Sequence, residues 1–446
     1  MGESGGISEA DLAAFHDVIG RLRDLPVDDP VRLRAEQVAA SFARDGRLRR
    51  RKARGAELSA ADAAAMAATA TGADGRREDA PLVAEGTGGV FLRPRPCYVC
   101  KVSYRQVDSF YHRLCPECAA DNRSRRALTT DLRGRRALLT GGRVKIGFQL
   151  ALMMLRDGAE LVVTSRFPHD TERRFRAAPG SEAWLDRLTV LAVDLRDPRQ
   201  VLGLCEELRQ TGEPLDILVN NAAQTVRRPA SSYAALAAGE TAELPPLARS
   251  APGFRPMDAA AGPAGQGALA LVLRDADEAG LLPDLAPENS WSARLGALDP
   301  AEVLETQLVN ALAPALLCDR LLPLLLASPR PRTYIVNVTA VEGRFAVRNK
   351  MAGHPHTNMA KAALNMLTRT SAAELAEQGV HMCAVDTGWI TDENPAPKKD
   401  RIAHAGFRTP LDIVDGAARV YDPIVRGESG APVSGVFLKD YREADW

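Results

Sequence analysis

The chain has 446 residues, of which 46% are hydrophobic and 26% charged, a balance that excludes a fibrous or largely disordered protein. This length exceeds one ordinary domain and predicts two or three. Lys plus Arg number 57, as do Asp plus Glu, so the formal net charge is zero. A neutral chain gives no support for a protein that coats nucleic acid or an anionic membrane.

No uninterrupted apolar stretch reaches about 18 residues, and the longest candidate, residues 311–328, is broken by Asp319, Arg320 and prolines. Residues 1–10 are polar and lack the apolar core of a signal peptide. We therefore expect no membrane span and a cytoplasmic location, where thiols stay reduced. Three scattered cysteines with apolar neighbours are expected in the core: Cys205, Cys318 and Cys383.

Residues 8–23 and 31–42 carry apolar side chains at helical spacing, and residues 59–70 are rich in alanine, so we expect three helices. A basic run at residues 47–54 separates the second helix from the third. A solvated helix end or linker is the simpler interpretation of this run, and contact with phosphates is the alternative. Residues 71–90, rich in Gly, Asp and Ala, indicate a linker. We predict that residues 1–90 form a helical module with its linker.

Four cysteines form two Cys-x-x-Cys pairs: Cys97, Cys100, Cys115 and Cys118. This spacing places four thiolates around one tetrahedral ion, and Zn²⁺ is the usual occupant of an all-sulfur site. His112 could replace a cysteine, although four thiols need no fifth ligand. Because four protein ligands leave no open position for substrate, we predict a structural zinc ribbon over residues 91–128. This segment holds 8 Lys or Arg against 3 Asp or Glu, a local charge of +5.

From residue 132 onward, short apolar runs alternate with amphipathic stretches. Strands are expected at residues 136–139, 160–164, 188–193, 215–219, 333–338 and 381–385, with helices at 148–156, 201–210, 300–317 and 361–377. This alternation predicts an α/β domain over residues 129–446, with a parallel sheet covered on both faces by helices. Residues 225–300 are rich in Pro, Gly and Ala and show no obvious strand, so we expect an insertion that acts as a substrate lid.

A glycine-rich turn follows the first of these strands, from Thr140 to Gly147. Glycines there let the backbone approach a pyrophosphate at the N-terminus of the next helix. The second strand ends at Ser165 and Arg166, where an acidic residue would bind the ribose hydroxyls of NAD. Ser and Arg suit the 2′-phosphate of NADP instead, although an arginine beside adenine can also stack without contacting phosphate.

Residues 132–446 resemble the short-chain dehydrogenase/reductase family, with six landmarks in the family's order. The turn at Thr140 to Gly147 is similar to TGxxxGxG. The others are Val193 to Leu195 beside adenine, Asn220 to Ala223 at the NNAG motif, Asn310 on the following helix, Lys361 of YxxxK, and Asp386 to Thr391 beside the nicotinamide. The resemblance implies a Rossmann-type, doubly wound parallel sheet, NADP or NAD as cofactor, and a homo-oligomer formed through the helices at 300–317 and 361–377. The cofactor-binding positions it implies are Gly141, Arg143, Lys145, Ile146, Gly147, Ser165, Arg166, Asp194, Leu195, Asn221, Ala222, Lys361, Thr387, Gly388 and Ile390.

The catalytic half departs from the family pattern. Thr357 occupies the position of the tyrosine that transfers the substrate proton, and Ala340, preceded by Thr339, occupies that of the serine. Lys145 replaces the middle glycine of the turn and could pair with a cofactor phosphate or point outward. A threonine hydroxyl is a far weaker acid than a phenol of pKa about 10, so another group must transfer the proton or none does.

The nearest replacements are His354, His356 and Glu342. Imidazoles titrate near neutrality, and His354 stands seven residues before Lys361, where enoyl reductases of this superfamily place their tyrosine. Either histidine could instead be a loop residue that caps or packs the next helix, whereas Lys361 can bind the nicotinamide ribose without a tyrosine. The candidate catalytic residues are Lys361, Thr357, His356, His354, Thr339 and Asn310.

Two functions of different classes follow. The first is an NADP(H)-dependent oxidoreductase with a noncanonical proton relay, acting on a small-molecule carbonyl or alcohol. The alternative is a catalytically silent protein that binds a dinucleotide and acts as a scaffold or redox sensor through its zinc module. The basic surface of that module, which has a charge of +5, could bind an acidic protein, an RNA or an acidic carrier. Direct DNA binding ranks third because few phosphate contacts are available, and no specific nucleic acid is expected. Lysines number only eight against 49 arginines, a bias that we attribute to genome composition.

Overall fold

The structure is a computed structural model that describes residues 6–84, 86–257, 276–277, 279–347 and 350–446. Its contacts divide the chain into two units, one of Met1–Ala64 with Phe91–Arg93 and the other of Ala65–Val90 with Pro94–Trp446. Most of the cysteine-containing segment, expected as a separate domain, thus belongs to the same unit as the sheet.

The first unit contains α1 (Glu9–Arg23) and most of α2 (Pro30–Ala67). α1 begins with a capping box between Ser8 and Asp11. The two helices expected at 31–42 and 59–70 and the basic run between them form the single helix α2. This part of the prediction was wrong because Arg, Lys, Leu and Ala in the run are strong helix formers and no proline interrupts them.

The second unit is built on a nine-stranded sheet of order β11-β10-β9-β8-β6-β3-β4-β5-β7. Its strands are β3 (Arg136–Leu139), β4 (Glu160–Ser165), β5 (Leu188–Ala192), β6 (Ile217–Asn220), β7 (Ala248–Ser250), β8 (Thr333–Thr339), β9 (Val380–Asp386), β10 (Phe437–Lys439) and β11 (Arg442–Ala444). The pairings are parallel except that of β10 with β11. Because strand order reverses beside β3, this is the doubly wound sheet that the sequence predicts.

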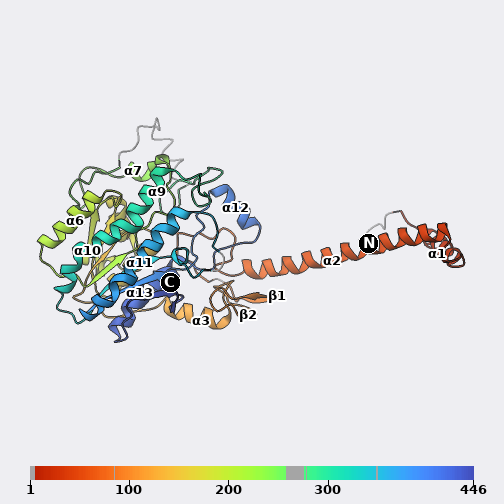
Figure 1. Ribbon diagram of the computed structural model, residues 1–446, viewed down its shortest axis with the longest axis horizontal. Coiled ribbons are helices and arrows are strands. Elements are labelled where there is room, and N and C mark those ends of the chain that lie inside the picture. Colours follow the sequence, from red (N-terminus) through yellow and green to blue (C-terminus); the bar gives the residue numbers. More distant parts are fainter. Residues whose placement is uncertain (1–5, 85, 258–275, 278, 348–349) are drawn as a thin grey trace. The chain divides into compact units, whose positions relative to one another are not determined.

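Helices cover both faces of the sheet (Figure 1). α4 (Lys145–Arg156), α5 (Pro168–Ala177) and α13 (Ile413–Glu428) lie on one face, and α6 (Pro198–Gln210), α10 (Ala313–Leu326) and α11 (Pro355–Glu377) lie on the other. Adjacent strand residues point to opposite faces, so Leu138 packs in one hydrophobic cluster and Leu139 in the other. This two-sided burial explains why the strands are apolar throughout.

Within the part of the chain that the structure describes, one helical stretch is long and apolar enough to cross a membrane, Pro300–Leu326, with a mean hydropathy of 1.5. It comprises α9 (Pro300–Gln307), a π turn at Leu308–Leu312 and α10. Half of its apolar window is buried inside the fold, and Leu317 and Leu321 lie in the cluster beneath the sheet. Packing against α6 and the sheet accounts for this hydropathy, as in a core helix.

The insertion expected at residues 225–300 has more structure than its composition indicates. It holds the 3₁₀ turn Ala230–Tyr233, α7 (Ala234–Ala237) and β7, which extends the sheet by pairing with β5. The expectation of no strand was wrong because three residues are too few for a hydrophobic period to be visible. Residues 258–275 and 278, which belong to the expected lid, lie outside the described residues.

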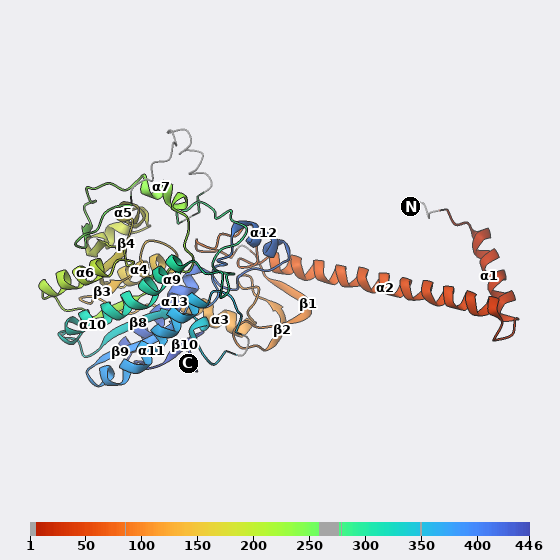
Figure 2. The same cartoon turned by 45° about the horizontal axis from the view of Figure 1, so that its top comes forward.

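The cysteine-containing segment forms an antiparallel hairpin of β1 (Gly89–Pro96) and β2 (Ser103–Val107), followed by α3 (Pro116–Arg125). α3 packs against α13 (Figure 2). Arg126 lies 2.5 Å from Asp412 and 3.1 Å from Asp415, and Arg125 lies 2.5 Å from Asp422. Part of the +5 charge is therefore neutralised within the same unit. Among the described residues, this unit also contains α12 (Ala396–His404) and three further 3₁₀ turns; these turns are Ser181–Ala183, Leu185–Arg187 and Val341–Gly343.

Candidate active site

A cavity of about 810 Å³ opens at the carboxyl ends of the parallel strands. The segments that follow β3, β4, β5, β6, β8 and β9 all contribute to its wall. In open α/β sheets, this crevice beside the reversal of strand order is where ligands bind. Every cofactor-binding position predicted from the sequence lines this cavity.

The glycine-rich turn is held by close backbone contacts. A Cβ on Gly147 would lie 2.1 Å from the Gly141 carbonyl oxygen and 2.6 Å from Asn221 Nδ2, so only glycine fits. Asn221 Nδ2 donates to the carbonyl oxygens of Thr140, at 3.0 Å, and Gly141, at 3.1 Å. The turn passes directly into α4, whose first backbone N–H groups have no side-chain cap. These groups can receive a pyrophosphate.

Lys145 adopts a left-handed backbone with φ of 52°. This is the position of the family's middle glycine, and a residue with a Cβ costs roughly 1–2 kcal/mol there. The Lys145 ammonium helps keep the pKa of Glu393 low against the effect of burial. The departure noted in the sequence is therefore a strained lysine that lines the cavity.

At the adenosine end, Ser165 is buried and its Oγ accepts hydrogen bonds from Phe167 N, at 3.0 Å, and Thr171 Oγ1, at 2.8 Å. The guanidinium of Arg166 lies 5.2 Å from the centre of the Tyr233 ring. No carboxylate of the described residues lies within ion-pair distance of Arg166. Its charge can therefore pair with a ligand at this end.

Two other predicted residues at this end already have partners in the protein. Arg143 is buried, lies 2.6 Å from Asp170 and donates to the Ala279 carbonyl oxygen. Asp194 lies 2.6 Å from Arg196. Burial raises the pKa of Asp194, but hydrogen bonds and charge from Arg196 outweigh this and keep the carboxyl ionised. These side chains line the cavity with most of their charge balanced.

Lys361 lies on α11 and is buried, and its Nζ donates to the Val338 carbonyl oxygen at 2.9 Å. Burial lowers its pKa to about 8, partly offset by Glu342. Thr339 Oγ1 donates to the Lys361 carbonyl oxygen at 3.4 Å. The buried hydroxyl of Thr357, one helical turn before Lys361, has no hydrogen-bond partner among the described residues. Burial and Asp386 raise the pKa of Glu342, which also lines the cavity.

The structure separates the two candidate histidines. His354 lines the cavity, and its ring stacks on Trp291 with centroids 4.0 Å apart. Its Nδ1 lies 2.8 Å from the Trp291 carbonyl oxygen, so Nδ1 carries the hydrogen and Nε2 is the nitrogen available for proton exchange. His356 is buried but does not line the cavity, and burial lowers its pKa.

Asn310 also lies away from the cavity wall. It sits in the π turn before α10, where its side chain accepts from Gln224 N at 2.7 Å and donates to Gln224 O at 2.9 Å. Asn310 therefore holds the segment after β6 in place and makes no contact in the cavity. Of the predicted catalytic residues, four line the cavity: Lys361, Thr357, His354 and Thr339.

Three residues that line the cavity were not predicted from the sequence. Tyr98 and Lys101, from the turn that carries Cys97 and Cys100, line the same cavity, and so does Lys439 of β10. Tyr98 Oη accepts a hydrogen bond from Trp389 N at 3.0 Å. Burial raises the pKa of Tyr98 to about 12, so the hydroxyl stays protonated. In the sequence, only the rarity of lysine singles out Lys101 and Lys439, and it does not indicate where in the fold they lie.

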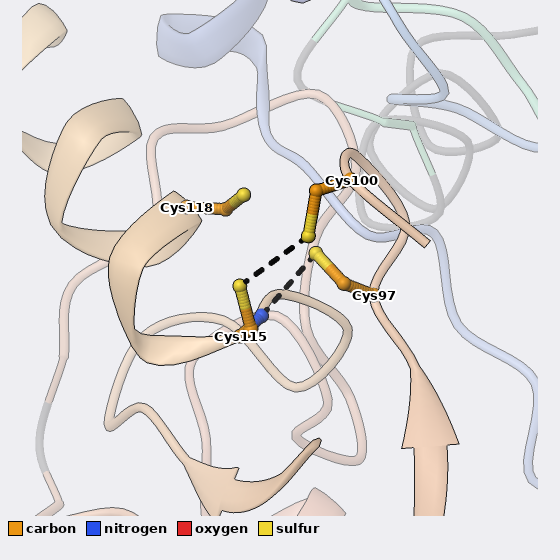
Figure 3. Close-up of side chains that lie close together, drawn as sticks. All are labelled: Cys97, Cys100, Cys115 and Cys118. Carbon is orange, nitrogen blue, oxygen red and sulfur yellow. Dashed lines mark hydrogen bonds between the residues drawn. The ribbon is translucent and has the colours of Figure 1, made fainter. Parts of the chain in front are cut away.

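The four cysteines predicted as metal ligands lie together, with their Sγ atoms all within 4.8 Å of one another (Figure 3). Cys100 Sγ and Cys115 Sγ are 3.6 Å apart, close to the roughly 3.8 Å between sulfurs of a tetrahedral site with 2.3 Å bonds. Cys115 N donates to Cys97 Sγ at 3.3 Å. His112 is not in the group, and its Nδ1 bonds to Thr71 Oγ1 at 2.8 Å. The residues present fit one tetrahedral ion.

Two family models match the chain, "short chain dehydrogenase" over residues 135–241 and "Enoyl-(Acyl carrier protein) reductase" over residues 280–411. Uncharacterized protein R665 of Acanthamoeba polyphaga mimivirus is 31% identical over 349 residues, 74% of this chain and 71% of that protein. Peroxisomal 2,4-dienoyl-CoA reductase of Danio rerio is 35% identical over 97 residues, 22% of this chain and 31% of the reductase. A solved short chain dehydrogenase from Burkholderia cenocepacia, in complex with NADP, is 22% identical, covers 69% of this chain and 97% of its own, and superposes with a TM-score of 0.45.

The sheet order and the cavity at its carboxyl edge define an α/β protein with a Rossmann-type dinucleotide fold. The matched models cover both halves of this domain, on either side of the insertion. The chain belongs to the short-chain dehydrogenase/reductase family, a family of NAD(P)-dependent oxidoreductases, as its sequence landmarks predicted.

Proposed function

We propose that this protein is an NADP(H)-dependent oxidoreductase that interconverts a carbonyl and an alcohol on a small molecule. The observation that carries the proposal is the single cavity into which the glycine-rich turn, Arg166 and Lys361 all project. When bound, the nicotinamide supplies or accepts the hydride. The first turn of α4 would hold the pyrophosphate, and Lys361 would hold the nicotinamide ribose.

NADP preference is proposed on the position of Arg166. Replacing Arg166 by Ala should weaken NADPH binding by about 10- to 100-fold, because one charge-assisted contact contributes roughly 1.5–3 kcal/mol. Affinity for NADH should change far less. Titrations followed by nicotinamide fluorescence measure both constants, with Arg199→Ala, an exposed arginine on α6, as the control. Equal losses for the two cofactors would refute a role in contacting the 2′-phosphate.

For the proton relay, we propose His354. Its Nδ1 donates a hydrogen bond to the Trp291 carbonyl oxygen, so Nε2 is the nitrogen that can exchange a proton with the substrate. Thr357 lacks the required acidity, and it would contribute a hydrogen bond at most. Glu342, whose carboxyl also faces the cavity, is the second candidate.

Replacing His354 by Gln should lower kcat by about 10²- to 10⁴-fold, the usual contribution of a positioned acid or base. The matched control is His356→Gln, which alters a histidine two residues away that does not line the cavity, and its kcat should stay within about threefold of the parent. Absorbance of the nicotinamide with a panel of carbonyls and alcohols measures both. Equal effects of the two substitutions would remove His354 from the relay. Tight NADPH binding without turnover on any substrate would favour the silent dinucleotide-binding alternative.

We also propose that Cys97, Cys100, Cys115 and Cys118 bind a structural Zn²⁺. The closeness of the four sulfurs supports this, and a site with four thiolates has no position left for substrate. Its role would be to fix the turn that carries Tyr98 and Lys101.

A further inference from the structure

Lysines gather in the cavity far more than composition predicts. The chain has eight lysines and 49 arginines. Five of the lysines but only four of the arginines line the cavity. The lining residues make up roughly a tenth of the chain, so about one lysine would be there by composition alone. The bias toward arginine therefore does not explain these positions. The five are Lys101, Lys145, Lys350, Lys361 and Lys439.

The four arginines and three of the five lysines in the cavity come from different segments of the fold. The arginines come from the segments after β3, β4, β5 and β6, where the adenosine half would bind. Three lysines come from places outside the dinucleotide motif: Lys101 from the cysteine turn, Lys350 from the segment before α11 and Lys439 from β10. A compact ammonium acts as a point charge and fits where a planar guanidinium does not.

Tyr98 is the centre of one such group. The Nζ atoms of Lys101 and Lys439 lie 5.2 Å and 5.4 Å from the centre of its ring. Because Tyr98 Oη accepts the Trp389 N–H, its own hydrogen is free to be donated to a ligand. Trp389 belongs to the segment that resembles the nicotinamide contact of the family, so this donor lies at the reacting end of the cavity.

The charged residues around Tyr98, Lys101 and Lys439 carry a net positive charge that could bind an anion. Lys439 is half-buried and its Nζ lies 3.1 Å from Asp386 and 3.3 Å from Asp440, so its ammonium is held in place. Lys101 is exposed, and no carboxylate of the described residues lies within ion-pair distance of it. Around the lysine-lined part of the cavity, five lysines stand against four carboxylates, those of Glu342, Asp386, Glu393 and the neighbouring Asp440. The formal sum in this part of the cavity is therefore positive.

We propose that Tyr98, Lys101 and Lys439 form a subsite for an anionic group on the substrate, so the substrate class is a carbonyl or alcohol that also carries a carboxylate or phosphate. This inference rests on the proposed function and names its substrate class. The cysteine cluster would then act on specificity as well as stability, because Lys101 N bonds to Cys97 O at 3.1 Å within the turn that presents both side chains.

The test uses the full-length, zinc-loaded protein and three ketones that share one ring. These are 4-acetylbenzoate, 4-acetylphenyl phosphate and the uncharged methyl 4-acetylbenzoate. Their dissociation constants are measured by calorimetry with and without saturating NADP⁺, which prevents reduction during the titration. We expect at least one of the anions to bind about tenfold or more tightly than the ester, and the tighter of the two identifies the carboxylate or the phosphate as the preferred group.

Lys101→Ala and Tyr98→Phe should each reduce the preference for the anion by about three- to tenfold, while leaving ester binding unchanged. The matched control is Lys52→Ala, since Lys52 does not line the cavity, and melting temperatures of all variants verify their folding. An ester that binds as well as both anions, or a preference that survives Lys101→Ala and Tyr98→Phe, would overturn the subsite. Failure of NADP⁺ to bind would instead overturn the proposed function, and the comparison without cofactor would still test the anion preference.

Discussion

Replacing Lys361 by Met is expected to lower kcat/KM by about 10²- to 10⁴-fold and to weaken NADP(H) binding. The buried ammonium is held by the Val338 carbonyl oxygen, and methionine has a similar length but neither charge nor donor. Under the proposed function, the substitution would remove both the hydrogen bonds by which Lys361 orients the cofactor and the positive charge beside the reacting carbonyl. Stopped-flow absorbance and cofactor titrations separate the two effects. The control is Lys398→Met, a lysine on α12 that does not line the cavity.

The same residue predicts a pH dependence. Burial lowers the pKa of Lys361 to about 8, so the ammonium that the reaction needs is lost as pH rises through about 8. The parent enzyme should lose kcat/KM above that pH, and the residual activity of Lys361→Met should lack this limb. The effect on stability has the opposite sign. Since the folded state binds this proton less tightly than the unfolded chain, the folded state gains relative stability between about pH 8 and the ordinary lysine value of about 10.4. A pH profile unchanged by Lys361→Met would assign the limb to another group.

The dinucleotide half could be predicted because its constraints are local. Gly147 must be glycine because a Cβ would meet the Gly141 carbonyl oxygen, and such backbone limits leave a recognisable spacing in the sequence. Lys361 was found in the same way, from its place in a motif on α11. Spacing also brought the four cysteines together correctly. It did not show that Arg143 is paired with Asp170, because Asp170 lies on α5, beyond the second strand.

The choice between His354 and His356 shows a limit of a different kind. The two residues flank Pro355, where α11 begins, and His354 has a left-handed backbone with φ of 42°. That conformation turns one imidazole toward the cavity while the other is buried elsewhere. The spacing of apolar residues cannot predict the direction of a side chain at the start of a helix, because the backbone there is not yet helical. Trp291, which orients His354, comes from the insertion, where the sequence shows little regularity.

Tyr98 and Lys101 could not be predicted because they reach the cavity through packing between distant segments. Arg125 and Arg126 pair with Asp422, Asp412 and Asp415 on α13, and Tyr111 Oη donates to Asp415 at 2.6 Å. None of these pairs has a signature in sequence spacing. They place the cysteine turn beside Trp389. The catalytic half of the cavity is thus completed from a segment that a motif search assigns to another domain.

Loss of the proposed Zn²⁺ should destabilise the cysteine-containing segment and open the wall of the cavity that Tyr98 and Lys101 form. Structural zinc sites in peptides contribute about 10–16 kcal/mol of apparent binding free energy. Ion pairs to α13 also hold the cysteine-containing segment, so the metal should contribute only part of this free energy. We expect the free energy of unfolding to fall by at least about 3 kcal/mol in Cys115→Ser or after chelation. At roughly 2.1 cal/mol/K of unfolding entropy per residue, a unit of about 380 residues shifts by only about 1.3 °C per kcal/mol, so the melting temperature should fall by about 4 °C or more.

Differential scanning calorimetry and metal analysis of the full-length protein test this expectation. The matched control is Cys205→Ala, which removes a buried thiol outside the cluster and should cost only about 1 kcal/mol without loss of metal. Chelator should destabilise the parent and the control but leave Cys115→Ser unchanged, because the serine variant has already lost the ion. Since Tyr98 and Lys101 lie on the turn fixed by the cluster, demetallation should also raise KM for substrate more than it lowers kcat. A zinc-free parent with the same melting temperature as the loaded protein would refute the structural role of the cysteines.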